Sequence, residues 1–123
     1  MKRCLVIDDS SVIRKVARAL LNNLGYEVIE AASGADGIAA CAAQMPDAIL
    51  LDWDLPDMSG FDFLVSLNRE FSGASHPYIV YATTENDPLD IARAISTGAS
   101  RYITVPFNRE TLAACFNRAD IAA

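Results

Sequence analysis

The chain has 123 residues, 52% of them hydrophobic and 21% charged, a balance typical of one globular domain and not of a disordered segment. Its formal net charge of −6 argues against non-specific binding to nucleic acid. No apolar run approaches the roughly 20 residues that a membrane-spanning helix needs, and the first residues show no signal-peptide pattern. We therefore expect a cytoplasmic protein without membrane insertion, whose three cysteines are reduced thiols in the core.

Short apolar runs alternate with segments of helical periodicity along the whole chain. Residues 48–51 contain no polar position, as in a strand that is buried on both faces of a parallel sheet. Between residues 12 and 24 the apolar side chains recur at helical spacing, and Gly25 is a stop signal. Residues 26–30 alternate in polarity, which predicts a strand nearer the sheet edge. We expect strands at 4–7, 26–30, 48–52, 77–82 and 101–105, and helices at about 12–24, 33–44, 60–73, 89–97 and 108–118.

Five successive strand-then-helix units imply a doubly wound α/β fold, in which helices cover both faces of a parallel sheet. Ligands bind such sheets at the carboxyl ends of the strands. The first strand is followed by Asp8 and Asp9, the third ends on Asp52, and the fourth is followed by Thr83. We therefore expect these three strand ends to converge on one small acidic pocket.

An acidic pocket of this kind is suited to phosphoryl chemistry. Three carboxylates within a few ångströms repel one another unless a cation holds them, and Mg²⁺ accepts carboxylate, water and phosphate oxygens. An aspartate can attack phosphorus in line and form an aspartyl phosphate. Asp52 is the candidate nucleophile, and the Thr83 hydroxyl is placed to donate to a phosphoryl oxygen.

Each residue also has an ordinary structural interpretation. Asp8 and Asp9 precede a helix, where acidic side chains commonly cap the first turn. Asp52 alone could be a loop residue, and Thr83 alone could cap the helix that follows. Three separate strand ends that carry suitable groups favour the functional interpretation, because the structural one requires three coincidences.

Four segments of the sequence carry a resemblance to a known family: VIDDSSVIRK, ILLDWDLPDMSG, YATT and GASRYITVPF. Together they resemble the receiver domain of bacterial two-component response regulators, in its stand-alone, CheY-like form. The resemblance extends from Lys2 to the last helix, and implies a single receiver domain over residues 1–123 with no output domain. It also implies a five-stranded sheet of order 2-1-3-4-5.

The same resemblance implies a role for each residue of the site. A sensor histidine kinase or a histidine phosphotransfer protein would supply the phosphoryl group, and the protein would act as a switch and not as an enzyme. A downstream protein, which the sequence does not identify, would read the change. The residues implied are the phosphoacceptor Asp52, the Mg²⁺ ligands Asp8, Asp9, Asp52 and the Asp54 main-chain carbonyl, the switch hydroxyl Thr83 and the switch aromatic Tyr102.

The chain departs from the family pattern just before Pro106. The family usually has lysine there, whose ammonium pairs with the phosphoryl group, and this chain has Val105. Arg101 and Lys15 are the nearest cationic candidates by sequence to replace it. Thr84 is a milder departure, because a small residue is common at that position.

Two other functions remain open at this point. The segment LLDWDLP also resembles the start of haloacid-dehalogenase-type phosphatases, although Pro56 stands where those enzymes usually have threonine or valine, and 123 residues leave little room for their other motifs. The second alternative is a binding module that no longer uses phosphate, with Val105 as its sign. The intact Asp8, Asp9, Asp52 and Thr83 weigh against that alternative.

Overall fold

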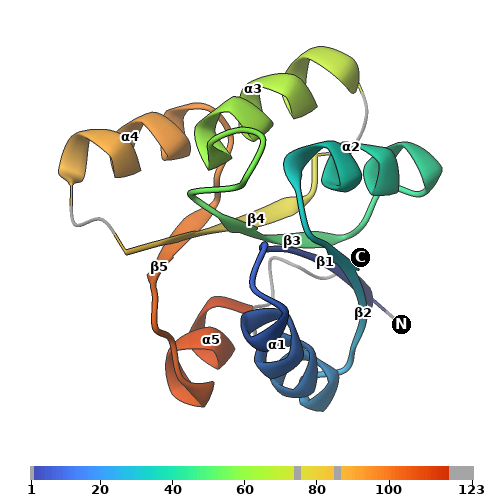
Figure 1. Ribbon diagram of the computed structural model, residues 1–123, viewed down its shortest axis with the longest axis vertical. Coiled ribbons are helices and arrows are strands. Elements are labelled where there is room, and N and C mark those ends of the chain that lie inside the picture. The colour runs from blue at the N-terminus through green and yellow to red at the C-terminus, as the bar shows by residue number, and fades with distance from the viewer. Residues whose placement is uncertain (1, 74–75, 85–86, 117–123) are drawn as a thin grey trace.

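The computed structural model describes residues 2–73, 76–84 and 87–116. Within these ranges a parallel five-stranded sheet has the order β2-β1-β3-β4-β5, which confirms the predicted fold class and strand order. Helices α2, α3 and α4 cover one face of the sheet, and α1 and α5 cover the other (Figure 1). The strands are β1 (Lys2–Ile7), β2 (Tyr26–Ala31), β3 (Ala48–Asp52), β4 (Tyr78–Thr83) and β5 (Arg101–Thr104), and the helices are α1 (Ser11–Asn23), α2 (Gly34–Ala43), α3 (Gly60–Glu70), α4 (Pro88–Ser96) and α5 (Arg109–Phe116).

The central strands are buried on both faces, as their unbroken apolar runs predict. Alternate residues of β1 enter two separate cores, so that Val6 packs toward α1 and α5 while Ile7 packs toward α2 and α3. Ile7 pairs with Leu51 of β3, and Leu51 pairs with Tyr81 of β4. This register brings the carboxyl ends of three adjacent strands to the same edge of the sheet.

The helices begin where the sequence places capping residues. The side-chain oxygens of Ser10, Ser33 and Ser59 each accept a hydrogen bond from the amide three residues ahead, at the starts of α1, α2 and α3. Helix α3 ends at Glu70, three residues before the predicted end, and a turn leads from it to Gly73. The predicted end of the last helix, Arg118, lies outside the described residues.

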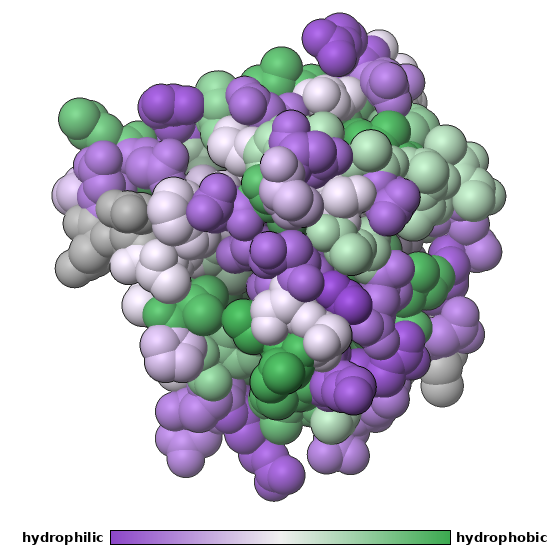
Figure 2. All heavy atoms as spheres, in the orientation of Figure 1, coloured by the Kyte–Doolittle hydropathy of each residue, from purple (hydrophilic) through white to green (hydrophobic). Residues whose placement is uncertain are grey.

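Helix α1 exposes part of its apolar surface. Ala17 and Leu21 face the sheet and are fully buried, whereas Val12 is 68% exposed and Val16 is 47% exposed. In Figure 2 hydrophobic atoms gather in the region of α1 and α5, below the hydrophilic atoms that cover the middle of the view. The apolar side chains of α1 therefore cover a wider part of the helix surface than the face that packs on the sheet.

The remaining expectations from composition concern the cysteines and the membrane. Cys4, Cys41 and Cys115 are buried free thiols, as predicted, and burial raises the pKa of Cys41 to about 11. Across the ranges that the structure describes, no helix has both the length and the apolar character to cross a bilayer.

Two tyrosines attach the end of α5 to the sheet. The Tyr26 hydroxyl donates to the Phe116 carbonyl at 2.9 Å, and the Tyr78 hydroxyl donates to the Cys115 carbonyl at 2.8 Å. The rings of both tyrosines meet the Phe116 ring edge to face. Burial raises the pKa of Tyr26 to about 12.

We predict that Tyr26→Phe lowers the free energy of unfolding by about 1–2 kcal/mol, because the ring contacts remain while a buried carbonyl loses its donor. Chemical denaturation measures this change. Tyr102→Phe is the matched control, because about half of Tyr102 is exposed, and its effect should stay within about 0.5 kcal/mol. Equal stability of Tyr26→Phe and the wild type would show that the hydroxyl bond adds nothing to the attachment of α5.

Candidate functional site

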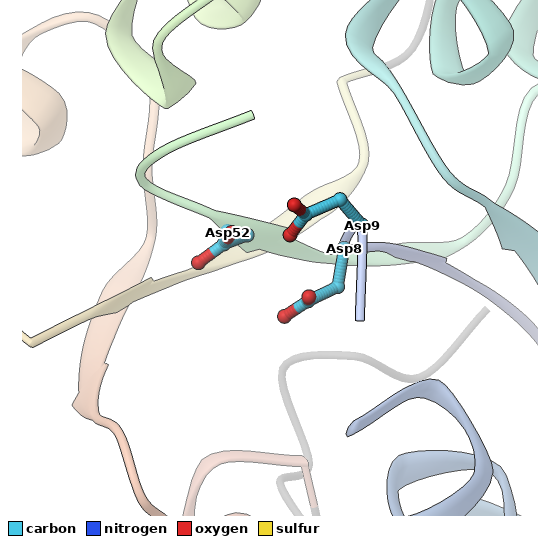
Figure 3. A group of neighbouring side chains, drawn as sticks. All are labelled: Asp8, Asp9 and Asp52. Atoms are coloured by element: carbon cyan, nitrogen blue, oxygen red, sulfur yellow. The ribbon is translucent and has the colours of Figure 1, made fainter. Parts of the chain in front are cut away.

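Three carboxylates meet at the carboxyl edge of the sheet. Asp8 and Asp9 follow β1, Asp52 ends β3, and one ligand oxygen from each lies within 4.8 Å of the others (Figure 3). The predicted convergence of these strand ends is therefore confirmed for Asp8, Asp9 and Asp52. Asp8 is buried, Asp52 is half-buried and Asp9 is exposed, so the cluster opens to solvent on one side.

Both the main chain and the side chain of Asp8 are held by hydrogen bonds. Its amide donates to the Ala31 carbonyl of β2 at 3.1 Å, and its Oδ1 accepts from the Ser10 amide at 2.8 Å. Its carbonyl accepts from Nη1 of Arg14 at 2.6 Å. These three bonds fix the direction of the Asp8 carboxylate at the end of a buried strand.

The loop after β3 turns back on itself before α3 begins. The Gly60 amide donates to the Trp53 carbonyl at 2.8 Å, and the Leu55 amide donates to the Met58 carbonyl at 3.1 Å. These bonds flank Asp54, and neither uses the Asp54 carbonyl. That carbonyl therefore keeps its capacity to accept a further bond or a cation, and its expected role as a metal ligand stays a prediction.

The same loop is fastened to two other parts of the molecule. A Cβ atom on Gly60 would lie 2.7 Å from both the Asp52 carbonyl oxygen and Cε1 of Tyr81, so only glycine allows this approach. Asp57 accepts from the amides of Gly34 and Ala35 at the start of α2, each at 2.9 Å, and these bonds hold the pKa of Asp57 below its usual range. The role of Asp57 could not be predicted from the sequence, because a carboxylate in a loop does not reveal which helix it caps.

The electrostatics of the cluster are unfavourable without a cation. Burial raises the pKa of Asp52 to about 7, and the neighbouring charges of Asp8 and Asp9 add to the rise. Burial also raises the pKa of Asp8, and the charge of Asp9 adds to that rise. The bond from the Ser10 amide and the positive charge of Arg14 act in the opposite direction on Asp8. Strands and loops therefore hold close together groups that repel when ionised.

The two proposed switch residues occupy different places. Thr83 is buried at the end of β4, next to Ala82, which pairs with Asp52. Tyr102 lies on the edge strand β5, pairs with Tyr81 and is 48% exposed. The sheet thus brings Thr83 to the edge that carries the acidic cluster, and leaves Tyr102 outside the cluster.

Val105 stands beside this edge without contributing a charge to it. Its amide donates to the Thr83 carbonyl at 3.0 Å, and its half-buried side chain packs against the core beneath α1 and α5. Arg101, one of the two cations considered as a replacement for lysine, donates instead to the Ala114 carbonyl at 3.3 Å. Among the described residues, Arg14 is the basic side chain that donates to the acidic segment Asp8–Asp9, and no sequence pattern marked it for this role.

Comparisons with known proteins agree with this geometry. The model of the response regulator receiver domain family matches residues 4–117. The protein PilH of Pseudomonas aeruginosa is 32% identical over 117 residues, which cover 95% of this chain and 96% of PilH. The structure of the chemotaxis protein CheY4 of Vibrio cholerae superposes with a TM-score of 0.87 at 33% identity, and covers 96% of this chain and 98% of that chain.

Other relatives are longer proteins. The transcriptional regulatory protein KdpE of Mycobacterium tuberculosis is 36% identical over 110 residues, which cover 89% of this chain but 47% of KdpE. The chain therefore spans about half the length of relatives of this kind, and nearly the whole of PilH.

We predict that Asp52 makes the metal-free protein less stable as the pH rises from about 4 to about 7. The folded protein retains the Asp52 proton at pH values where the unfolded chain, with a pKa near 3.8, has lost it. The free energy of unfolding should therefore fall across this range, by roughly 2 kcal/mol from this group after allowance for solvent screening. Chemical denaturation at several pH values measures the fall.

Asp52→Asn is the comparison that isolates this contribution, because other carboxyl groups titrate in both proteins. In the absence of divalent cations, the free energy of unfolding of Asp52→Asn should rise relative to that of the wild type as the pH increases toward 7. A difference that does not vary with pH would show that Asp52 has an ordinary pKa and is not crowded by its neighbours.

Proposed function

Because the chain belongs to the response regulator receiver domain family, we propose that it is a phosphorylation-dependent signalling switch in which Asp52 accepts a phosphoryl group. The observation that supports this function above all is the meeting of Asp8, Asp9 and Asp52 at the carboxyl edge of the sheet. Receiver domains typically accept phosphate from histidine kinases, and are typically not true enzymes. A sensor histidine kinase or a histidine phosphotransfer protein is thus the proposed donor.

The cluster has the ligand chemistry of a Mg²⁺ site. Asp8, Asp9 and Asp52 supply carboxylate oxygens, the Asp54 carbonyl adds a neutral one, and a hard divalent cation prefers such an all-oxygen set. Bound there, Mg²⁺ would neutralise charge on the phosphoryl oxygens. The raised pKa of Asp52 supports the assignment, because burial and then the charges of Asp8 and Asp9 disfavour the ionised carboxylate, and a bound cation would favour it.

The transfer step requires Asp52 as a carboxylate. One carboxylate oxygen attacks phosphorus, and the bond between phosphorus and the donor nitrogen breaks as the new bond forms. The electron pair of the broken bond stays on the departing imidazole. The Thr83 hydroxyl, at the end of the neighbouring strand, would donate to a phosphoryl oxygen on the product.

We propose that the signal leaves through the surface formed by α4, β5 and α5. A groove of about 630 Å³ runs along this surface, and its lining includes Tyr102, Ile95 and Pro106. Movement of Thr83 toward the phosphoryl group would make room into which Tyr102 could turn, and a partner protein would read the new arrangement. The two residues are coupled only if phosphorylation favours one arrangement over the other.

One feature favours a second function, that of a binding module independent of phosphate. Val105 places an apolar side chain where the resemblance leads us to expect a lysine, so one charge-assisted contact to the phosphoryl group is missing. The intact acidic cluster favours the phosphate-dependent function over this alternative.

We predict that the wild type gains one phosphoryl group from acetyl phosphate in the presence of Mg²⁺ and none when the cation is chelated. Intact-mass spectrometry measures this gain. Asp52→Asn should gain none, because its side chain lacks the nucleophilic oxygen. Asp62→Asn, which alters an exposed carboxylate in the first turn of α3, should behave as the wild type. Equal labelling of Asp52→Asn and the wild type would remove Asp52 from the mechanism.

We predict that Val105→Lys strengthens the response to phosphorylation and leaves phosphorylation itself dependent on Mg²⁺. The restored contact is worth roughly 1.5–3 kcal/mol when well formed, whereas a complete shift between two states needs about 5.5 kcal/mol. Phosphorylation-induced changes in the amide chemical shifts of β4 and β5 should therefore be larger in this variant.

The matched control is Val65→Lys, which adds the same charge on the exposed side of α3. It should leave the shift changes as they are in the wild type. If the wild-type changes are already saturated and Val105→Lys adds nothing, another contact has replaced the lysine.

A further inference from the structure

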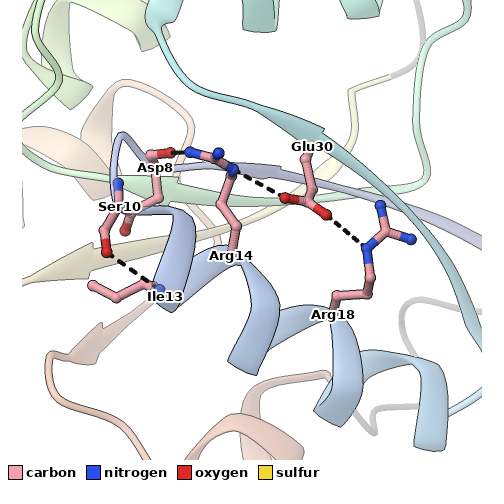
Figure 4. Close-up of polar contacts among 6 residues, drawn as sticks. All are labelled: Asp8, Ser10, Ile13, Arg14, Arg18 and Glu30. Atoms are coloured by element: carbon pink, nitrogen blue, oxygen red, sulfur yellow. Dashed lines mark hydrogen bonds and ion pairs between the residues drawn. The ribbon is translucent and has the colours of Figure 1, made fainter.

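Arg14 connects the acidic segment Asp8–Asp9 to the neighbouring edge strand β2. Its Nη1 donates to the Asp8 carbonyl at 2.6 Å, while its Nε donates to Glu30 of β2 at 2.9 Å (Figure 4). The Arg14 side chain is 17% exposed, so both contacts are shielded from most of the solvent. A planar guanidinium can hold two acceptors in fixed directions at once, which an ammonium group does less well.

Glu30 is itself held in place by a second arginine. Its other oxygen accepts from Nε of Arg18 at 2.6 Å, and the two guanidinium groups keep the pKa of Glu30 below its usual range. Glu30 therefore remains ionised at neutral pH and holds Arg14 against the end of β1. The resulting chain of contacts runs from α1 across β2 to the main chain of Asp8 (Figure 4).

The position of Asp8 depends on this chain of contacts. The Asp8 amide donates to the Ala31 carbonyl of β2. The Asp8 carbonyl accepts from Arg14, which Glu30 of β2 holds, so both main-chain groups of Asp8 are positioned by β2. On the opposite side of the site Val105 packs against the core and adds no charge. The acidic segment is therefore fixed from the β2 side of the site.

We propose that Arg14 is a positioning residue for the cation site, in which its guanidinium, held by Glu30, fixes the Asp8 main chain so that the Asp8 and Asp9 carboxylates face Asp52. This inference rests on the proposed function and assigns to it a residue that touches neither the cation nor the phosphoryl group. The positioning role of Arg14 can be separated by experiment from the effect of its positive charge.

A positioning role and a purely electrostatic role of Arg14 predict opposite changes in Mg²⁺ affinity when Arg14 is replaced. If Arg14 acted on the site through its charge alone, its loss would leave the cluster more negative, and Mg²⁺ would bind about two- to threefold more tightly. If Arg14 fixes the ligands, its loss should weaken binding at least about tenfold, as removal of residues that orient metal ligands generally does.

The experiment is a Mg²⁺ titration of Arg14→Met, followed by Trp53 fluorescence and by the backbone amide resonances of Asp8 and Asp9. We expect a rise of about tenfold in Kd, and metal-free shifts at these amides that differ from the wild type. Arg14→Lys keeps the charge but loses the fork, so its Kd should lie between those of the wild type and Arg14→Met.

The matched control is Arg3→Met, which removes the same charge from the opposite end of the β1 and β2 pair, where Arg3 lies 3.4 Å from Glu27. Its Kd for Mg²⁺ should stay within about twofold of the wild type. Glu30→Gln, which loosens Arg14 without shortening a side chain, provides a second route if Arg14→Met does not fold. Loss of the Glu30 charge alone would weaken Mg²⁺ binding only about two- to threefold, so loosening of Arg14 should be seen as a weakening of about tenfold.

Equal or tighter Mg²⁺ binding by folded Arg14→Met, or a weakening of no more than about threefold by Glu30→Gln in its place, would overturn the inference and leave the proposed function intact. A wild-type protein that neither binds Mg²⁺ nor gains a phosphoryl group would overturn the proposed function and this inference together.

Discussion

The mutual repulsion of three carboxylates is the constraint on which the rest of this structure depends. Asp8, Asp9 and Asp52 lie within 4.8 Å of one another, and burial adds to the cost of their charges. A fold tolerates such a cluster when rigid elements hold it and when a cation relieves it. Here the rigid elements are β1 and β3, whose side chains are buried in two cores. The energy of burying those strands offsets the cost of the charges at their ends.

Contacts around the cluster of Asp8, Asp9 and Asp52 hold its main chain in place. Asp57 ties the loop after Asp52 to the start of α2, and Gly60 lets α3 begin directly against the Asp52 main chain. Arg14 holds the Asp8 carbonyl from the other side. These contacts act on main-chain groups and leave the carboxylate oxygens at the centre of the site, where a cation and a phosphoryl group would need them.

Strand order, cap positions and the meeting of the acidic residues could be predicted from the sequence, because each depends on local patterns or on the rule that parallel strands end at one edge. The roles of Arg14 and Asp57 could not, since each contact joins residues at least 16 positions apart or reaches a main-chain group that no side-chain pattern marks. The exposure of Val12 could not be predicted either, because helical spacing does not show how wide a face of the helix is buried. Nor does the sequence show where the candidate cation Arg101 lies, since its contact is to the Ala114 main chain of α5.

If the three carboxylates are held together to bind a cation, as we propose, removing one of them should cost the protein its cation and not its stability. The most direct test compares the thermal unfolding of the wild type and Asp9→Asn with and without Mg²⁺. We expect metal-free Asp9→Asn to unfold at the same or a higher temperature than the wild type, because it removes one repelling charge. We also expect Mg²⁺ to raise the unfolding temperature of the wild type and to have little effect on the variant. A metal-free variant that is less stable than the wild type and responds equally to Mg²⁺ would show that the three carboxylates do not form a cation site.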